Sequence, residues 1–186
     1  RKNGLQPVDN PSEIFISQGR RISAGSTIIS CMEGTRALLV EIQALVARAN
    51  FGMPERKVSG VDYNRVSMLL AILEKRIGLK LGGQDIFVNI VGGVQIDEPA
   101  ADLGIAMTIA SSFKEKVIPS DIVFVGEVGL GGEVRSVSQI EIRLKEAQRL
   151  GFKRAVIPKD NAKGIGKELG IERIEVCYLS EAVEII

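Results

Sequence analysis

The order of strand-like and helix-like segments constrains the fold of this chain most strongly. Two β-branched, apolar runs at 27–32 and 37–46 are separated by Glu33-Gly34-Thr35-Arg36, which predicts a β-hairpin. After residue 60, segments with apolar residues every three or four positions alternate with short apolar runs. This order predicts an α/β fold (α+β with a mixed sheet), in which an initial hairpin is followed by alternating strands and helices.

Individual segments refine this prediction. Val66 and the apolar positions up to Ile77 fall at helical spacing, and Gly78 supplies a stop. Residues 85–91 are typical of a buried central strand, whereas the Gly, Pro and charged residues of Phe51–Gly60 predict an exposed loop. Further helices are expected at 99–113, from 140 to about 150 and at 180–186, and further strands at 121–127, 133–137, 154–158 and 174–179.

The chain divides into two unequal parts. Residues 1–25 are polar and rich in Pro, Gly and Ser, with a small apolar anchor at 14–16, and predict a linker that docks on the domain. Residues 26–186 are expected to form a single domain, since a chain of 186 residues is within the range of one folded unit.

Composition excludes several classes of function. The sequence contains no histidine, which excludes Ser-His-Asp and Cys-His catalysis and His-ligated zinc within this chain. Cys31 and Cys177 show no C-x-x-C spacing and are interpreted as small buried residues of a cytoplasmic protein. No apolar run approaches the ~20 residues that span a bilayer. The glycines match no phosphate-binding loop, so this chain is not expected to bind a nucleotide itself.

Charge is unevenly distributed along the chain. Residues 1–80 carry 12 Lys/Arg and 7 Asp/Glu, an excess of five positive charges, whereas residues 81–186 carry 12 and 16, an excess of four negative charges. A polyanion such as DNA would therefore contact the first half through sequence-independent phosphate contacts. A solvated surface is the alternative interpretation for each cation. Aromatic residues make up 4% of the chain and Trp is absent, so no base-stacking platform is expected. The candidate DNA-binding residues are Arg20, Arg21, Arg36, Arg56, Lys57 and Arg65.

The segments around residues 100 and 141 resemble the proteolytic domain of Lon-type Ser–Lys peptidases. Asp97-Glu-Pro-Ala-Ala-Asp102 matches the stretch that carries the serine nucleophile, and Val125–Glu141 matches the stretch that ends in the catalytic lysine. The serine position is Ala100 and the lysine position is Glu141, so the resemblance implies a Lon-like fold without a catalytic dyad.

The polar and charged residues near positions 100 and 141 allow other interpretations. Glu141 is predicted to form a capping box with Ser138, and Glu98 and Asp102 are interpreted as first-turn acids at a helix start rather than metal ligands. Either Asp97 or Glu98 is expected to cap that helix. A relocated nucleophile is the alternative, with the candidates Ser136, Ser138 and Lys145; Ser111 and Ser112 lie roughly 16–18 Å along the helix from Ala100 and are too distant.

The longer match is to the C-terminal Lon-like domain of the bacterial RadA (Sms) family of DNA-repair proteins. It spans about residues 10–160. The stretches that carry it are 10–15, 33–43, 60–65, 84–89, 97–103, 125–130 and 140–147. The resemblance implies that Arg36, Arg56 and Arg65 contact DNA; Gln95 replaces a basic residue of many relatives, so a contact there would be weaker.

The same resemblance implies functions for a longer protein. Members carry a zinc finger and a RecA-like ATPase ahead of this domain, so ATP, Mg²⁺ and Zn²⁺ are expected to belong to those segments and none to this chain. The family drives branch migration of recombination intermediates, and its Lon-like domain is a DNA-contacting scaffold of a ring, expected to be a hexamer. Partners would be single- or double-stranded DNA and a recombinase or replicative helicase. A domain that only assembles the ring, without contacting DNA, is a further alternative.

Overall fold

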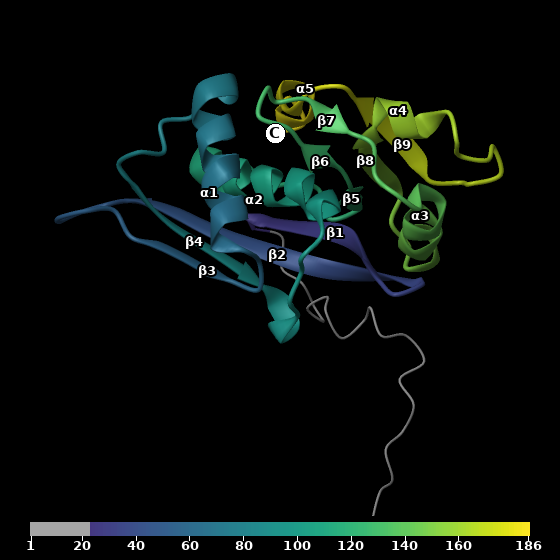
Figure 1. The fold of residues 1–186 in the computed structure, drawn as a ribbon, viewed down its shortest axis with the longest axis horizontal. Coiled ribbons are helices and arrows are strands. Elements are labelled where there is room, and N and C mark those ends of the chain that lie inside the picture. Colours follow the sequence, from purple (N-terminus) through teal and green to yellow (C-terminus); the bar gives the residue numbers. More distant parts are fainter. Residues whose placement is uncertain (1–22) are drawn as a thin grey trace, which may run out of the picture.

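The computed structural model describes residues 23–186, and its central element is a mixed sheet of seven strands with the order β3-β4-β2-β1-β5-β8-β9 (Figure 1). These strands are β1 (Ser26–Glu33), β2 (Arg36–Arg48), β3 (Arg56–Ser59), β4 (Gln84–Ile90), β5 (Ile122–Phe124), β8 (Arg154–Pro158) and β9 (Glu172–Val176). A separate small sheet pairs β6 (Glu127–Val128) with β7 (Val134–Arg135). The predicted α/β class is confirmed. The linker interpretation of residues 1–25 falls almost entirely outside the described residues, as do Arg20 and Arg21.

Five α-helices accompany the sheet in the described part of the chain: α1 (Tyr63–Ile72), α2 (Asp102–Lys114), α3 (Ile140–Arg149), α4 (Lys159–Ala162) and α5 (Leu179–Val183). A π-helical turn, Leu73–Ile77, continues α1, and Gly78 follows it at φ 82°, as the predicted stop requires. Short 3₁₀ turns lie at Val91–Gly93 and Pro99–Ala101, the second directly before α2.

The predicted hairpin forms the two long neighbouring strands β1 and β2 of the sheet. β1 and β2 pair antiparallel from Ser26↔Gln43 to Glu33↔Arg36, so the tight turn lies where the sequence placed it. The far half of β2 pairs with β4, from Ile42↔Ile90 to Arg48↔Gln84. Consequently β2 connects two halves of the sheet, and its two ends are far apart.

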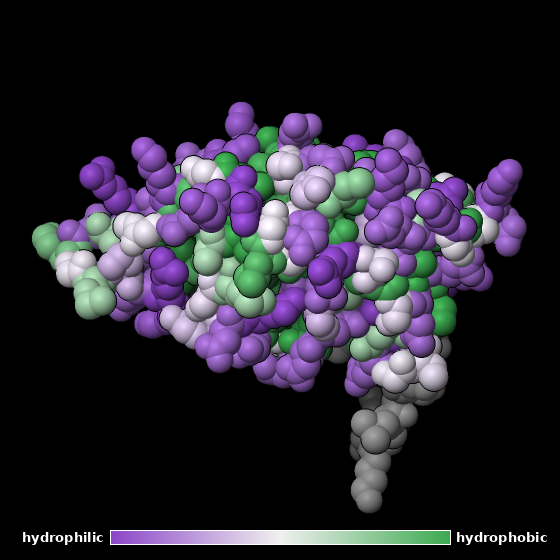
Figure 2. Space-filling model, turned by 45° about the horizontal axis from the view of Figure 1, so that its top comes forward, coloured by the Kyte–Doolittle hydropathy of each residue, from purple (hydrophilic) through white to green (hydrophobic). Residues whose placement is uncertain are grey.

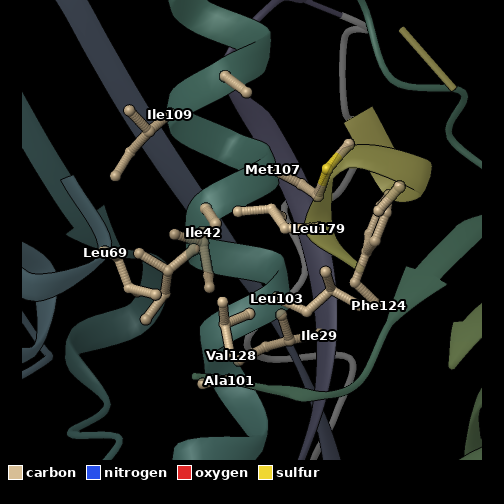
Figure 3. Packing of buried hydrophobic residues seen from close by; sticks show 14 of the residues in the cluster. Ile29, Ile42, Leu69, Ala101, Leu103, Met107, Ile109, Phe124, Val128 and Leu179 are labelled. Atoms are coloured by element: carbon tan, nitrogen blue, oxygen red, sulfur yellow. The ribbon is translucent and has the colours of Figure 1, made fainter. Parts of the chain in front are cut away.

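Two apolar clusters lie on opposite faces of the sheet because neighbouring strand residues point to opposite sides. On one face, Leu103 and Met107 of α2 pack with Ile29 of β1 and residues of α1 and α5 (Figure 3). A Cβ on Gly104 of α2 would lie 2.1 Å from the Ile29 Cγ2, so this close approach requires glycine. On the other face, Ile28 packs with apolar residues of α3, which are Ile140, Leu144 and Ala147.

Three local predictions were wrong or incomplete. Residues 56–59 form the edge strand β3 rather than loop, because their backbone pairs with β4 while alternate side chains face solvent. β4 has a strand on each side, as predicted, but Asn89 is exposed and Phe87 only half-buried, because these two side chains point away from the face on which Ile86, Val88 and Ile90 join the core. Of the pair expected at 121–127 and 133–137, only the two-residue strands β6 and β7 pair with each other, whereas β5 joins the main sheet.

Candidate functional site

Ala100, which aligns with the position of a Lon-type nucleophile, lies in the 3₁₀ turn before α2 and is buried. Its methyl group belongs to the cluster that includes Ile140 and Leu144 of α3, and its carbonyl accepts a 3.0 Å hydrogen bond from the Gly126 amide. The side chain therefore serves packing, and a methyl group provides no nucleophile.

Glu141, which was predicted to align with a Lon-type catalytic lysine, anchors a distant loop. Its Oε1 accepts a 2.8 Å hydrogen bond from the Gly166 amide. The predicted capping box with Ser138 is wrong, because the residue preceding α3 is Gln139 in the left-handed conformation at φ 56°, with no side-chain cap. The Ser138 carbonyl instead accepts a 2.9 Å hydrogen bond from Arg143 Nε.

An ion pair joins Glu98, two residues before Ala100, to Arg143, two residues after Glu141. Arg143 Nη1 and Nη2 donate to the Glu98 carboxylate at 2.6 and 2.8 Å, and the Arg143 side chain is 1% exposed. Such a two-point pairing is the geometry that guanidinium and carboxylate prefer. Glu98 was expected to be a helix cap or a first-turn acid. Although it directly precedes the 3₁₀ turn, its side chain caps neither that turn nor α2.

This ion pair also completes the hydrogen bonding of the edge of β1. β5 pairs with β1 only at Ile28 and Ile29, so the next backbone groups of β1 need other partners. The Met32 amide donates to Glu98 Oε1 at 2.8 Å, and Arg143 Nη1 donates to the Ser30 carbonyl at 2.9 Å. Glu98 and Arg143 thus substitute for a neighbouring strand.

A second ion pair holds the start of α2. Arg65 of α1 donates through Nε to Asp102 Oδ1 at 2.7 Å and through Nη2 to Oδ2, and the Val128 amide donates to Oδ2 at 3.1 Å. Burial raises the pKa of the Asp102 carboxyl, against the opposing effect of the hydrogen bonds from Arg65 and Val128. The hydrogen bond to Asp102 raises the pKa of Arg65 above its usual value. Asp102 is an acid in the first turn of α2, as predicted, and it is also buried and paired with Arg65.

Among the candidate DNA-binding residues that the structure describes, Arg36 and Arg56 lie at opposite ends of the sheet. Arg36 begins β2 at the hairpin turn, whereas Arg56 lies level with Val46 across β4, ten residues further along β2. At about 3.3 Å per strand residue, Arg36 and Arg56 are therefore separated by roughly 33 Å along the direction of β2. Lys57 is exposed beside Arg56, with Nζ 3.8 Å from Glu55 Oε2. Arg65 keeps 28% of its side chain exposed but directs its guanidinium to Asp102. DNA contacts of these residues stay a prediction.

The alternative of a relocated nucleophile meets specific structural obstacles. The Ser111 hydroxyl accepts a hydrogen bond from the Gly25 amide, and that of Ser112 from the Val46 amide, both at 2.9 Å. Ser136 and Lys159 line one cleft of about 560 Å³, but between residues 23 and 186 no hydrogen bond joins them. Burial raises the pKa of the Cys31 thiol to about 12, which keeps it protonated and weakly nucleophilic at neutral pH.

The part of the chain that the structure describes contains neither a metal-binding cluster nor a membrane-spanning helix. Within residues 23–186, no group of three or more His, Cys, Asp or Glu side chains is arranged to hold a metal ion. Over the same range, none of the helices combines the length and apolar character that crossing a membrane requires.

The chain is similar both to a known protein family and to a group of named relatives. The family model described as "ChlI: Subunit ChlI of Mg-chelatase" matches residues 42–161. The chain belongs to the ChlI family. This match covers the far half of β2, both ion pairs and the positions of Ala100 and Glu141.

Proteins named DNA repair protein RadA are similar over nearly the whole chain. The one from Bacillus subtilis is 54% identical over 183 residues, which are 98% of this chain and 40% of the relative. The one from Halalkalibacterium halodurans is 50% identical over 185 residues (100% and 40%), and that from Synechocystis 44% over 184 residues (99% and 36%). The chain thus spans about two fifths of the length of the curated relatives it matches. Close homology to proteins named RadA, as expected from the sequence, is confirmed; the Lon-like character of the domain stays a prediction.

Two groups of residues escaped the sequence analysis. Arg143 was not singled out, although its place between Ile140, Leu144 and Ala147 on the apolar side of α3 could have indicated a buried arginine in need of a partner. Phe51 and Met53 were assigned only to a loop, and the sequence carries no signal that both side chains are almost fully exposed.

Proposed function

We propose that this chain is a non-proteolytic, Lon-like scaffold domain of a RadA-type DNA-repair protein. In this proposal it self-associates into a ring, expected to hold six copies, and contacts the DNA backbone without sequence preference. ATP hydrolysis with Mg²⁺, and Zn²⁺ binding, belong to segments of the longer protein outside this chain. That protein drives branch migration with a recombinase or helicase as partner. The RadA-named relatives support this assignment.

The side chains at positions 100 and 141 carry the non-proteolytic part of the proposal. Hydrolysis through a Ser–Lys dyad needs a hydroxyl and an unprotonated amine within hydrogen-bond reach. Here a methyl group takes the first position, and the second is a carboxylate bound to Gly166. The Glu98 carboxylate and the Arg143 guanidinium, which both bond to the edge of β1, are bound to each other and so are not free to contact a substrate.

DNA binding is expected to depend on Arg56 and Lys57, which lie in β3, level with the C-terminal end of β2 across β4. The double change Arg56→Ala and Lys57→Ala should reduce affinity for a 30-nucleotide strand and for the matching duplex about tenfold at 50 mM salt, and lower the slope of log affinity against log salt by about 1–2. Fluorescence anisotropy across 50–200 mM salt measures both. Arg36→Ala, at the other end of the sheet, tests the second predicted contact separately, and Lys116→Ala near the end of α2 is the exposed control.

The rival proposal, a peptidase with a relocated nucleophile, predicts covalent labelling. We expect no serine of the chain to react with a fluorophosphonate probe, because Ser111 and Ser112 are engaged and Ser136 has no bonded base. Intact-mass spectrometry after incubation checks this, with unfolded casein as a parallel substrate. Labelling lost specifically in Ser136→Ala would reject the scaffold proposal in favour of the peptidase.

A ring-forming domain without DNA contact is the third possibility. It predicts that the chain sediments as an oligomer while anisotropy stays unchanged on both nucleic acids even at 50 mM salt. Sedimentation velocity of the same samples separates this outcome from a misfolded protein, which would also fail to bind.

A further inference from the structure

The loop between β2 and β3 ends in two exposed apolar side chains that the proposed DNA backbone contacts do not use. Phe51 is 96% exposed and Met53 89% exposed, on either side of Gly52. The loop forms the end of the molecule at the left of Figure 1, and the same end carries apolar side chains in Figure 2. Neither side chain contributes to the core, so their apolar surface is available to a partner.

The base of this loop is fixed while its tip stands clear. The Ala49 amide donates to the Gly83 carbonyl at 3.2 Å on one side. On the other, the Glu55 amide donates to Asp85 Oδ1 at 2.7 Å, and the Glu55 carbonyl accepts from the Ile86 amide at 2.8 Å. Gly52 adopts φ 73°, and a Cβ there would meet nothing within 4 Å. Hydrogen bonds thus hold the stem on both sides, and the tip projects from it with its side chains exposed.

Cations surround the stem. Arg48 ends β2 directly before the loop, and Arg56 and Lys57 begin β3 directly after it. Lys80 lies exposed in the adjacent 78–83 loop, which the Ala49–Gly83 hydrogen bond joins to the stem. The carboxylates here are Glu55, 3.8 Å from Lys57, Asp85, which accepts from the Glu55 amide, and Glu74, which accepts from the Leu81 amide of the 78–83 loop at 3.1 Å. Four cations against three carboxylates leave a positive balance, and of the three cations next to the tip in sequence, Arg48, Arg56 and Lys57, only Lys57 forms an ion pair within the described residues, with Glu55.

We propose that this loop is a wedge that inserts Phe51, supported by Met53, between or onto bases of nucleic acid, while Arg48, Arg56 and Lys57 hold the flanking phosphates. Phe and Met are side chains that partly unstack base steps when inserted, and bases stack on an aromatic ring regardless of sequence. One aromatic residue is no stacking platform, so the composition argument from 4% aromatics is compatible with a single wedge. The inference rests on the proposed DNA binding and assigns it a point of base contact.

Charge distinguishes this partner from a second copy of the chain. An apolar tip that entered a hollow of a second copy would need a carboxylate there for each arginine or lysine that becomes desolvated, because a buried cation without a partner is costly. Phosphates on either side of an unstacked base provide the complementary charge at the distance of neighbouring nucleotides. Nucleic acid is thus the partner that both the tip and its surround fit.

The experiment uses the 186-residue chain with a 20-nucleotide strand that contains 2-aminopurine, whose fluorescence rises when its neighbours unstack. The wild-type chain should raise this fluorescence at saturation. Phe51→Ala should bind about tenfold more weakly and lose the rise, and Phe51→Tyr should keep both. Arg56→Ala with Lys57→Ala should weaken binding but retain the rise at saturation. Leu130→Ala, a matched change at an exposed apolar residue of the β6–β7 turn, should alter neither.

The outcomes separate this inference from the proposal beneath it. If the wild-type chain binds no DNA, the proposed DNA binding fails, and the wedge with it. If the chain binds but Phe51→Ala matches it in affinity and fluorescence, only the wedge is overturned. If Phe51→Ala sediments as a smaller species with unchanged DNA affinity, the tip belongs to contacts between copies, which also overturns the wedge. Far-UV circular dichroism confirms that each variant is folded.

Discussion

Replacing Arg143 with alanine is expected to lower the free energy of unfolding by about 3–5 kcal/mol. The change removes both hydrogen bonds to Glu98 and the donors to the Ser30 and Ser138 carbonyls. Within residues 23–186, Glu98 would then be a carboxylate, 24% exposed, that keeps only the hydrogen bond from the Met32 amide. Because the pair also completes the edge of β1, its loss acts on the strand that lies at the centre of the sheet.

Urea unfolding followed by far-UV circular dichroism measures this effect, since the chain lacks tryptophan for fluorescence. Arg135→Ala is the matched control: this arginine pairs with Glu133 at 3.4 Å but is 63% exposed, so its removal should cost no more than about 1 kcal/mol. The double variant Glu98→Ala with Arg143→Ala should lose less than the sum of the single changes, because neither charge is left alone. Additive losses, or a loss for Arg143→Ala as small as that of the control, would show that the ion pair does not support β1.

The elements that could be predicted from the sequence are those with a strong local signal. The hairpin turn at 33–36, the end of the first helix at Gly78 and the strand at 154–158 all depend on spacing and turn residues close together in sequence. The strand β3 was missed because only pairing with β4, nearly thirty residues later, makes those polar residues a strand. The exposure of Asn89 and Phe87 on one face of β4 likewise depends on tertiary packing, which the local sequence does not specify.

The partners of the site residues could not be predicted from the sequence. The residue types at positions 100 and 141 indicate which side-chain chemistry is available there. They do not indicate that Glu98 binds Arg143, 45 residues away, or that Asp102 binds Arg65, 37 residues away, because both pairs form only when α1 and α3 pack near the start of α2. Acids near a helix start interact favourably with the helix dipole, so the interpretation as first-turn acids followed the local signal, which carries no information about a tertiary partner.

Arg65→Ala is expected to destabilise the fold by about 2–3 kcal/mol at pH 7, below the range for fully buried pairs because Arg65 is partly exposed. The change leaves Asp102 buried, with the Val128 amide as a remaining donor. This bears on the predicted DNA contact of Arg65, since a variant that weakens the fold would weaken binding whether or not the side chain touches phosphate. Adding Asp102→Asn to Arg65→Ala should recover most of the loss, because a neutral amide replaces the unpaired charge.

The pH dependence identifies the charge of Asp102 as the cause. Burial already raises the pKa of the Asp102 carboxyl, and loss of Arg65 removes a hydrogen bond that lowers it, so this pKa should rise further in the variant. A carboxyl with a higher pKa in the folded state binds its proton preferentially there, so it contributes more stability as pH falls and less as pH rises through that pKa. The difference in unfolding free energy between wild type and Arg65→Ala should therefore narrow from pH 7 to pH 5, and stay constant when Asp102→Asn is present in both. A gap independent of pH would mean that Arg65 supports the fold through packing rather than charge, whereas unchanged stability with weakened DNA binding would assign its guanidinium to phosphate.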